Sequence, residues 1–376
     1  MISKRKQILC VCTETHTGMR DFAIPIVKAA SKNFDVCSLF VTNPAKPCDE
    51  LYKMVDGMDV VIISQPKSSM LKMLNRTYSF KLKKAIDKIC KERGIDTIWL
   101  LTGDTMVAPF IGHLEKKYSV YYTVHDLFPH EAPYRSFKQR VVYNFFFQRH
   151  FNKLLKKCYR LVTSSMAQYD YIRKNMKIKK AFYHPFPSLV NDSIHPNQCP
   201  ELKGLHDYIL YFSTIGHYKG VDLLYNAFIN SKLLNDKYKL ILAGGGKIFF
   251  ERTVEKESNV IIINRFIKDQ EIPSLFNDAK AVVFPYRTAT QSGNISYVYH
   301  NPKLLLLSDI PYFKEIATEE KTALFFDNEN ADSLQRKLEQ LMFETDEMEM
   351  KRNQTEEYAR LYSEKALAGY IKEIFE

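Results

Sequence analysis

The chain has 376 residues, a length that favours two domains over one. Hydrophobic residues make up 45% and charged residues 26%, which are ordinary globular values, so the composition excludes disordered, collagen-like and long coiled-coil proteins. The net charge of +11 is uneven, because residues 1–200 carry 32 Lys and Arg against 16 Asp and Glu, whereas residues 201–376 carry 22 against 27. The basic half is expected to meet an anionic partner, either nucleic acid or a membrane surface.

The seven cysteines are an odd number, and several lie in apolar runs, which indicates reduced and buried thiols of a cytoplasmic protein. Cys10 and Cys12 have no second pair at zinc-ligand spacing, so no metal site is expected. The N-terminus lacks a long apolar stretch with a cleavage site, and no uninterrupted run of about 18 apolar residues occurs. Any membrane contact is therefore expected to be peripheral.

Short apolar runs alternate with helical patterns in the first half of the chain. Runs that are continuous rather than alternating are typical of strands buried on both faces of a parallel sheet. The expected strands are 7–12, 35–41, 59–64, 96–101, 120–124 and 160–165. Residues 1–187 are therefore predicted to form a Rossmann-like domain.

A proline-rich stretch without periodicity predicts a linker over 188–203, after which the alternation resumes. The expected strands of the second half are 208–213, 238–245, 259–264, 279–286, 303–308 and 323–326. Residues 204–350 are predicted to form a second Rossmann-like domain, and from Ala331 onward the pattern is helical. The fold class is thus α/β, with two doubly wound domains facing a cleft. The C-terminal helix over 351–376 is expected to cross back to the first domain.

A glycine run, Gly244-Gly245-Gly246-Lys247, follows the predicted strand at 238–243. A P-loop needs a further glycine and a Ser or Thr at positions that Ile241 and Ile248 occupy, so the run is interpreted as a tight strand-to-helix turn.

Two stretches of the second domain carry patterns that occur together in one protein family. In residues 209–227, a strand is followed by a short loop ending in Lys219-Gly220 and by an amphipathic helix. The pattern within residues 259–315 comprises Phe284-Pro285-Tyr286, Thr290-Gln291-Ser292-Gly293, Ser308-Asp309-Ile310-Pro311 and Glu315. These elements, in this order, resemble the donor-binding domain of the retaining glycosyltransferases of family 4 (glycosyl transferases group 1), which have the GT-B fold.

The resemblance implies a nucleotide diphosphate sugar as donor substrate, retention of the anomeric configuration, and no metal or other cofactor. Backbone amides of Ser292, Gly293 and Asn294 would bind the diphosphate, because N–H groups and the dipole at a helix N-terminus favour an anion. Lys219 would stabilise the departing nucleoside diphosphate. The alternative for Lys219 is a solvated surface lysine.

The sequence also departs from the family pattern. Ser213-Thr214 stands where the family usually has Gly-Arg, so one phosphate-binding cation is missing, and either Arg265 replaces it or Arg265 is a surface residue. The family's paired glutamates would fall at Thr290 and Val298, neither of which is acidic. Gln291 or Thr290 is therefore expected to contact the donor sugar.

The first domain contributes two further candidates. Gly18 follows the first predicted strand and is expected in a loop that donor or acceptor approaches closely. His125 in VHDLFPHE (124–131) resembles the family's strand-end His-Asp and is expected to polarise an acceptor hydroxyl or bind the donor sugar. The alternative is that His125 caps a turn with Asp126, and His130 is interpreted as structural.

A basic segment from Arg135 to Lys180 contains 13 Lys and Arg and a single acid, Asp170. Its centre predicts a helix with a Phe-rich apolar face flanked by basic residues, the pattern of a peripheral helix on an anionic bilayer. The expected membrane or acceptor contacts are Arg149, Lys153, Lys156 and Lys157. The alternative is a core helix with a solvated charged rim.

We therefore expect a glycosyltransferase that transfers a sugar to a polysaccharide precursor or glycolipid at the cytoplasmic face of the inner membrane, as a peripheral protein. The expected partners are a nucleotide-sugar donor, a lipid-linked or polysaccharide acceptor and an anionic membrane surface. Nucleic acid is not expected, because no nucleic-acid-binding module is visible in the sequence. A non-catalytic GT-B subunit and a nucleotide-sugar epimerase are the alternatives.

Overall fold

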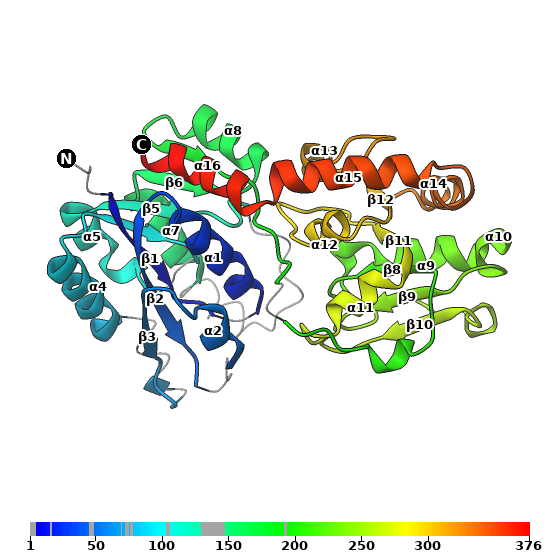
Figure 1. Cartoon of the computed structure of the whole chain (residues 1–376), viewed down its shortest axis with the longest axis horizontal. Helices are drawn as coiled ribbons and strands as arrows, with labels where there is room; N and C mark the ends of the chain where they lie inside the picture. The colour runs from blue at the N-terminus through cyan, green and yellow to red at the C-terminus, as the bar shows by residue number, and fades with distance from the viewer. Residues whose placement is uncertain are drawn as a thin grey trace. The chain divides into compact units, whose positions relative to one another are not determined.

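The computed structural model describes residues 5–376 except 16, 45–48, 69, 72–74, 76–77, 103–105, 129–146 and 192–193. The chain divides into two compact units (Figure 1). The first unit is Met1–Pro187 with Glu364–Glu376, and the second is Ser188–Ser363.

The first unit is built on a parallel sheet of seven strands in the order β3-β2-β1-β4-β5-β6-β7. Its strands are β1 Gln7–Cys12, β2 Asp35–Thr42, β3 Val60–Ser64, β4 Thr97–Leu100, β5 Ser119–Thr123, β6 Arg160–Thr163 and β7 Lys180–Tyr183. In register, Ile8 lies opposite both Val36 of β2 and Thr97 of β4. The central strand β1 is fully buried from Ile8 onward, which explains its continuous apolar sequence.

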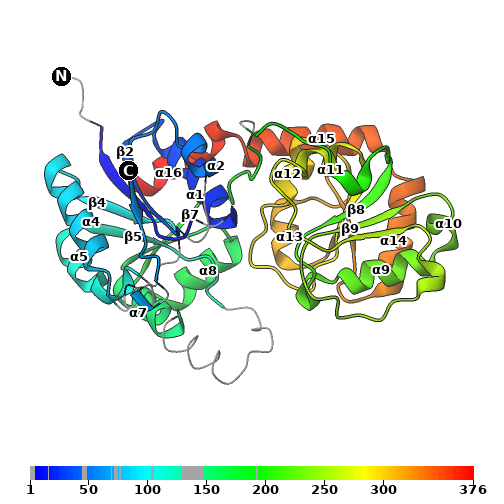
Figure 2. The same cartoon turned by 90° about the horizontal axis from the view of Figure 1, so that it is seen from below.

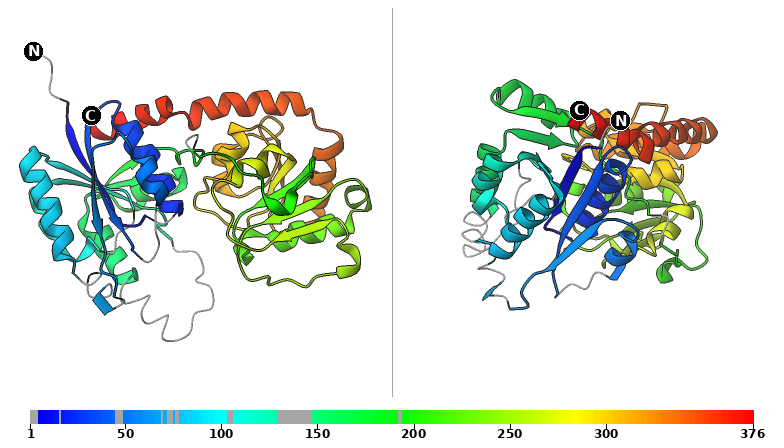
Figure 3. Two further views of the ribbon diagram at one scale, coloured as in Figure 1. Left: turned by 60° about the horizontal axis from the view of Figure 1, so that its bottom comes forward. Right: turned by 60° about the vertical axis from the view of Figure 1, so that its left-hand side comes forward.

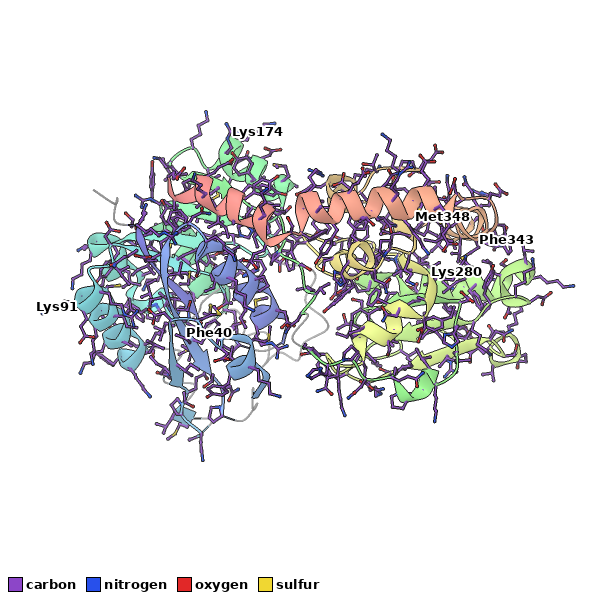
Figure 4. The ribbon with its side chains drawn as sticks, in the orientation of Figure 1. Phe40, Lys91, Lys174, Lys280, Phe343 and Met348 are labelled. Carbon is purple, nitrogen blue, oxygen red and sulfur yellow. The ribbon has the colours of Figure 1, made fainter. Side chains whose placement is uncertain are left out.

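Helices cover both faces of this sheet (Figure 3). One face carries α1 Thr17–Ala30, α2 Asp49–Met54 and α16 Glu364–Phe375, and the other carries α4 Phe80–Arg93, α5 Ile111–Lys117, α7 Arg149–Lys157 and α8 Met166–Asn175. Local signals set the ends of α4, because the Ser79 side chain accepts a hydrogen bond from the Leu82 amide and Gly94 adopts the left-handed conformation. Basic side chains such as Lys91 on α4 and Lys174 on α8 point away from the sheet (Figure 4).

The second unit has a parallel sheet of six strands in the order β10-β9-β8-β11-β12-β13. Its strands are β8 Tyr208–Phe212, β9 Leu240–Ala243, β10 Val260–Ile263, β11 Ala279–Phe284, β12 Leu304–Ser308 and β13 Leu324–Phe326. Its helices are α9 Val221–Asn230, α10 Lys232–Asn235, α11 Ile272–Asn277, α12 Ile295–His300, α13 Pro311–Ile316, α14 Ala331–Phe343 and α15 Glu347–Leu361. Helices α9 and α14 pack together on one face, and α12 and α15 pack on the other (Figure 2).

The C-terminal helix α16 belongs to the first unit and packs along α1. Its last aromatic residue, Phe375, contacts the rings of Trp99 and Tyr121, with centroids 5.2 and 4.6 Å away. The Asn33 side chain also donates a hydrogen bond of 3.0 Å to the Ala368 carbonyl. These contacts attach the end of the chain to the first sheet.

The observed division of the chain differs from the expected one at two points. Residues 188–203, expected as a linker, lie within the second unit, and the returning segment begins at Glu364 rather than at residue 351. Residues 351–361 complete α15, which packs on α12 of the second unit. All twelve expected strands are present, and β7 is an additional edge strand that the sequence pattern did not reveal.

Candidate active site

The candidate donor site lies at the carboxyl ends of β8 and β11, which are neighbours in the second sheet. The loops that follow these strands touch at Gly220, whose φ is +63°. A Cβ atom at this position would lie 1.8 Å from the Pro285 carbonyl oxygen, so only glycine allows the two loops to meet. Gly220 is therefore required for the packing of these two loops.

The glycine run at 244–246 lies at the same edge of the sheet, directly after β9. A Cβ atom at Gly244 would lie 1.8 Å from the Ser213 carbonyl oxygen, and Ile215 pairs with Gly246 in a parallel bridge. The run is thus a tight turn, but the next helical element is the short 3-10 turn Val254–Lys256 rather than an α-helix. Its glycines bring the loop after β9 against the loop after β8.

Lys219 is the last residue of a 3-10 turn, η4 His217–Lys219, between β8 and α9. Its Nζ lies 3.6 Å from the centroid of the Tyr286 ring and 5.2 Å from that of Tyr218. Tyr286 is fully buried and Lys219 is half-buried, so the ammonium rests on the face of an aromatic ring. Lys219 is therefore not a fully solvated surface lysine, and its role toward the leaving diphosphate stays a prediction.

The loop 290–294 contacts the same tyrosine at its hydroxyl group. Asn294 donates from Nδ2 to the Phe212 carbonyl at 2.9 Å and to the Tyr286 hydroxyl at 3.3 Å. Ser292 and Gly293 are buried, and the Ser292 carbonyl accepts a 3.0 Å hydrogen bond from the Tyr312 hydroxyl. The structure thus brings Lys219 and the Ser-Gly-Asn loop together around Tyr286.

Thr290 and Gln291 lie half-buried in the loop between β11 and α12, as the resemblance implied. Val298 is fully buried within α12, so the position at which the family has its second glutamate is a core position in this chain. Val298 therefore cannot take the place of that glutamate in contacting a donor.

Arg265 lies in a different environment from Lys219. Its guanidinium donates to both carboxylate oxygens of Glu201, at 2.7 and 2.6 Å, and to both oxygens of Glu271, at 2.8 Å each. The hydrogen bond from Arg265 lowers the pKa of the Glu201 carboxyl to about 2. Two carboxylates neutralise this cation, so the expectation that Arg265 replaces the missing phosphate-binding arginine is corrected to a structural role.

The same cluster bears on metal binding. Among the described residues, Cys199, Glu201 and Glu271 form one group whose potential ligand atoms lie within 4.8 Å of one another. Arg265 Nη2 lies 3.7 Å from the Cys199 sulfur and hydrogen-bonds both carboxylates. The positive charge between these groups is therefore the guanidinium itself, and the cluster is a structural ion network.

In the first unit, Gly18 lies within the first turn of α1 rather than in a loop, which corrects the expectation. A Cβ atom at Gly18 would meet no atom within 4 Å, so the fold of this unit does not require glycine here. Helix α1 begins as soon as Thr17, which the sequence pattern did not reveal because this helix has no acidic residue in its first turn.

His125 follows β5, and its Nε2 lies 2.9 Å from the carbonyl oxygen of Leu101, at the end of the neighbouring strand β4. The Phe22 ring of α1 packs edge-on against the imidazole at 4.6 Å. Burial lowers the pKa of His125, so the ring is neutral near pH 7. The Leu101 carbonyl is a partner of His125 that the sequence did not predict, and His130 lies outside the described residues.

Helix α7 carries the four basic residues expected to contact a membrane. Leu154 of this helix is buried in the core of the first unit, and Phe151 and Leu155 pack against the same core. Lys153 donates to the Pro109 carbonyl at 2.9 Å, whereas Arg149, Lys156 and Lys157 are exposed. Over 149–157 the structure agrees with the alternative, a core helix with a solvated charged rim, because the core of the first unit covers the apolar face. The part of the basic segment over 135–146 lies outside the described residues.

Sequence reasoning missed two residues that support this site. Arg287, directly after the Phe-Pro-Tyr motif, forms a bidentate ion pair with Asp222 in the first turn of α9. Both side chains are largely buried. The sequence signal that could have revealed this pair is that Arg287 directly follows Tyr286 and Asp222 closely follows Lys219-Gly220.

The family profile of the glycosyl transferases group 1 matches residues 200–362. Three solved structures share the fold over almost the whole chain. A sucrose-phosphate synthase from Thermosynechococcus elongatus is 14% identical with a TM-score of 0.69, over 99% of this chain and 98% of its own. HepE from Anabaena in complex with UDP and glucose is 13% identical with a TM-score of 0.64, over 98% of each chain. The lipopolysaccharide outer core galactosyltransferase WaaB is 12% identical with a TM-score of 0.63, over 98% of this chain and 99% of its own.

No curated protein matches the sequence. The GT-B fold predicted from the sequence motifs is confirmed, and so is the resemblance to the glycosyl transferases group 1. The family match over residues 200–362 and the shared fold make the chain similar to glycosyltransferases. Within the described part of the chain, no helix combines the length and the apolar character needed to cross a bilayer.

Proposed function

We propose that this chain, whose second unit matches the glycosyl transferases group 1, transfers a sugar from a nucleotide diphosphate sugar to a polysaccharide precursor or glycolipid. The reaction retains the anomeric configuration and needs no metal ion. The protein works as a peripheral protein at the cytoplasmic face of the inner membrane.

The observation that carries this proposal is the position of Lys219 against Tyr286, next to the Ser-Gly-Asn loop. Breaking the bond between the sugar and the diphosphate leaves growing negative charge on the leaving phosphate. A preorganised ammonium stabilises that charge, because its position costs no reorganisation during the reaction. Backbone amides of Ser292, Gly293 and Asn294 bind the same diphosphate.

The proposed chemistry uses Lys219 where other transferases use a metal ion. The ammonium supplies the positive charge at the diphosphate, and the sequence contains no Asp-x-Asp triplet of the kind that holds manganese. Tyr286 supports this role because its ring attracts the ammonium without neutralising it.

His125 is the proposed sugar or acceptor contact of the first unit. This role rests on its place directly after β5 and on its burial, which keeps the imidazole neutral near pH 7 and able to act on a hydroxyl as a base.

Membrane contact is proposed to be electrostatic. The exposed Lys156 and Lys157 lie on a strongly basic unit, and cationic side chains near an anionic leaflet contribute about 1 kcal/mol each. The apolar face of α7 takes no part, since it belongs to the core.

A non-catalytic GT-B subunit is the second candidate, and two observations favour it. Val298 is buried where the family has a glutamate, and Arg265 is held by two carboxylates. Such a subunit would bind a nucleotide sugar without turning it over.

A panel of UDP-glucose, UDP-galactose, UDP-N-acetylglucosamine and GDP-mannose tests the proposal, first by thermal shift and then by release of the nucleoside diphosphate. A ligand that binds only the native state raises the melting temperature. We expect one donor to raise it and to be turned over, in slow hydrolysis or with an added acceptor. Binding without turnover would favour the non-catalytic subunit, and no binding by any donor would contradict both.

A further inference from the structure

The turn that carries Lys219 is held by Arg287. The two terminal nitrogens of this guanidinium donate to the two carboxylate oxygens of Asp222, at 2.8 and 2.7 Å. The exposed fractions of the two side chains are only 12% and 17%. A bidentate pair of this kind fixes both direction and distance.

Arg287 also binds the turn itself. Its Nη1 donates to the His217 carbonyl at 2.6 Å, and its backbone N–H donates to the Tyr218 carbonyl at 2.9 Å. Two of the three residues of the turn His217–Lys219 are therefore attached to this arginine, and Lys219 is the third. Because Asp222 lies on the helix that follows, the same guanidinium fixes the chain on both sides of Lys219.

The arginine is anchored in turn to the rest of the sheet. Asn328 donates from Nδ2 to the Arg287 carbonyl at 2.9 Å, and the Asn328 amide donates to the Asp309 carboxylate at 2.9 Å. Arg287 also follows Tyr286 directly in the chain, so the ring beneath the ammonium and the clamp on its turn come from adjacent residues.

We propose that Arg287, together with Asp222, is a positioning residue that holds the Lys219 ammonium where the diphosphate leaves. This inference rests on the proposed function of Lys219. Arg287 is not assigned to the phosphate itself, because its terminal nitrogens already donate to Asp222 and His217. Lysine cannot replace it, because a single ammonium lacks the planar fork that binds a carboxylate and a carbonyl at once.

The first test measures the position of Lys219 without any donor. Lysines are reductively methylated with ¹³C-formaldehyde, and the methyl signals of Lys219 are identified by their loss in Lys219→Arg. Because Nζ lies over the Tyr286 ring, we expect these signals to be shifted upfield by the ring current. In Arg287→Gln and in the milder Asp222→Asn, the upfield shift should decrease.

The matched control is Arg252→Gln. Arg252 forms a similar two-point ion pair with Glu257, beside the 3-10 turn Val254–Lys256. Its loss should leave the Lys219 signals and the turnover unchanged. Thermal melts of all variants show whether each one is folded.

The second test measures turnover with the donor of the panel that reacts fastest. Misplacing a catalytic group by about 1 Å can cost on the order of 100-fold in rate, so we expect kcat to fall at least tenfold in Arg287→Lys and Asp222→Asn. The KM for the donor should change less than threefold, because the amides of the Ser-Gly-Asn loop remain in place. The double variant Arg287→Lys, Asp222→Asn should be no slower than the slower single variant.

Unchanged Lys219 signals in both Arg287→Gln and Asp222→Asn would overturn the inference, and so would unchanged kcat in folded variants. An absence of turnover in the unmodified protein with every donor would contradict the proposed function alone. The methyl signals would then still decide whether Arg287 holds Lys219.

Discussion

Lys219 and Arg265 are cations at the carboxyl ends of strands of the same sheet, after β8 and β10, but their surroundings differ. Lys219 lies over a buried aromatic ring, with no ion pair within 4 Å among the described residues. Arg265 is bound by the two carboxylates of Glu201 and Glu271. A ring attracts a cation without cancelling its charge, whereas two carboxylates leave none for a ligand. The surroundings of each cation, rather than its place at a strand end, therefore indicate its role.

The largest effect is expected for Lys219→Ala. Removing one preorganised charge-stabilising group costs on the order of 100- to 1000-fold in rate, so turnover of the nucleotide sugar should fall in this range. Lys237→Ala is the control, because Lys237 also lies over a ring, that of Phe343, at 4.8 Å. Equal rates for the Lys219 variant and the unmodified protein would refute the assigned site.

Helix α7 also carries both a hydrogen-bonded lysine and exposed lysines, so the effect of their surroundings can be tested there. Lys153 is bound to the Pro109 carbonyl, whereas Lys156 and Lys157 are exposed. Replacing Lys156 and Lys157 by Glu should weaken binding to anionic vesicles by about 2 kcal/mol or more, which is roughly 30-fold. Lys153→Gln should have a smaller effect in the same sedimentation assay. Indifference of the unmodified protein to anionic lipid would exclude membrane contact by these residues.

The variant Arg265→Ala tests whether Arg265 stabilises the fold rather than binding phosphate. The change leaves two carboxylates close together, so we expect a loss of about 1–2 kcal/mol of unfolding free energy, reduced by the partial exposure of Glu201. Turnover should stay within twofold of the unmodified rate at a temperature where the variant is folded. Chemical denaturation and a donor assay measure the two quantities. A rate loss comparable to that of Lys219→Ala would instead restore Arg265 as a phosphate-binding cation.

The Arg265 network also predicts how stability depends on pH. The pKa of Glu201 is lowered to about 2, mainly by its hydrogen bond with Arg265. Because the pKa of Glu201 is lower in the folded than in the unfolded protein, its carboxylate stabilises the fold at pH values above about 4.5. This contribution is lost as the pH falls from about 4.5 toward 2. In Glu201→Gln, the free energy of unfolding should decrease less over this interval than in the unmodified protein. Identical pH profiles would show that the pair does not couple to folding.

The smallest effect is expected for Gly18→Ala. Gly18 lies in a helix and has room for a Cβ atom, so alanine should raise stability by about 0.5–1 kcal/mol. If a donor approaches the backbone here, its affinity should fall while the melting temperature rises. Equal donor affinity in the alanine variant would remove Gly18 from the binding site.

The strands were predictable because burial on both faces leaves continuous apolar runs. Strand β7, Lys180–Tyr183, escaped prediction because it is a short edge strand with no buried residue and a lysine at its start. The helical C-terminal segment was predicted, but its division at Ser363 was not, because both sides of this residue have helical patterns.

The site was predictable where adjacent residues define it. Lys219-Gly220 and the Ser-Gly-Asn loop follow strands in a recognisable order, and the structure places both against Tyr286. The role of Arg265 was not predictable, because its partner Glu201 lies 64 positions earlier in the chain. The Arg287–Asp222 pair was hidden for the same reason, since 65 positions separate its members.

The central claim is that Lys219, and not Arg265, provides the positive charge for the diphosphate. Calorimetric titration of the nucleoside diphosphate of the active donor, compared with the uncharged nucleoside, tests it directly. We predict that the extra affinity due to the phosphates falls at least tenfold in Lys219→Ala and stays within twofold in Arg265→Ala. The opposite pattern, or an equal loss in both variants, would contradict this account.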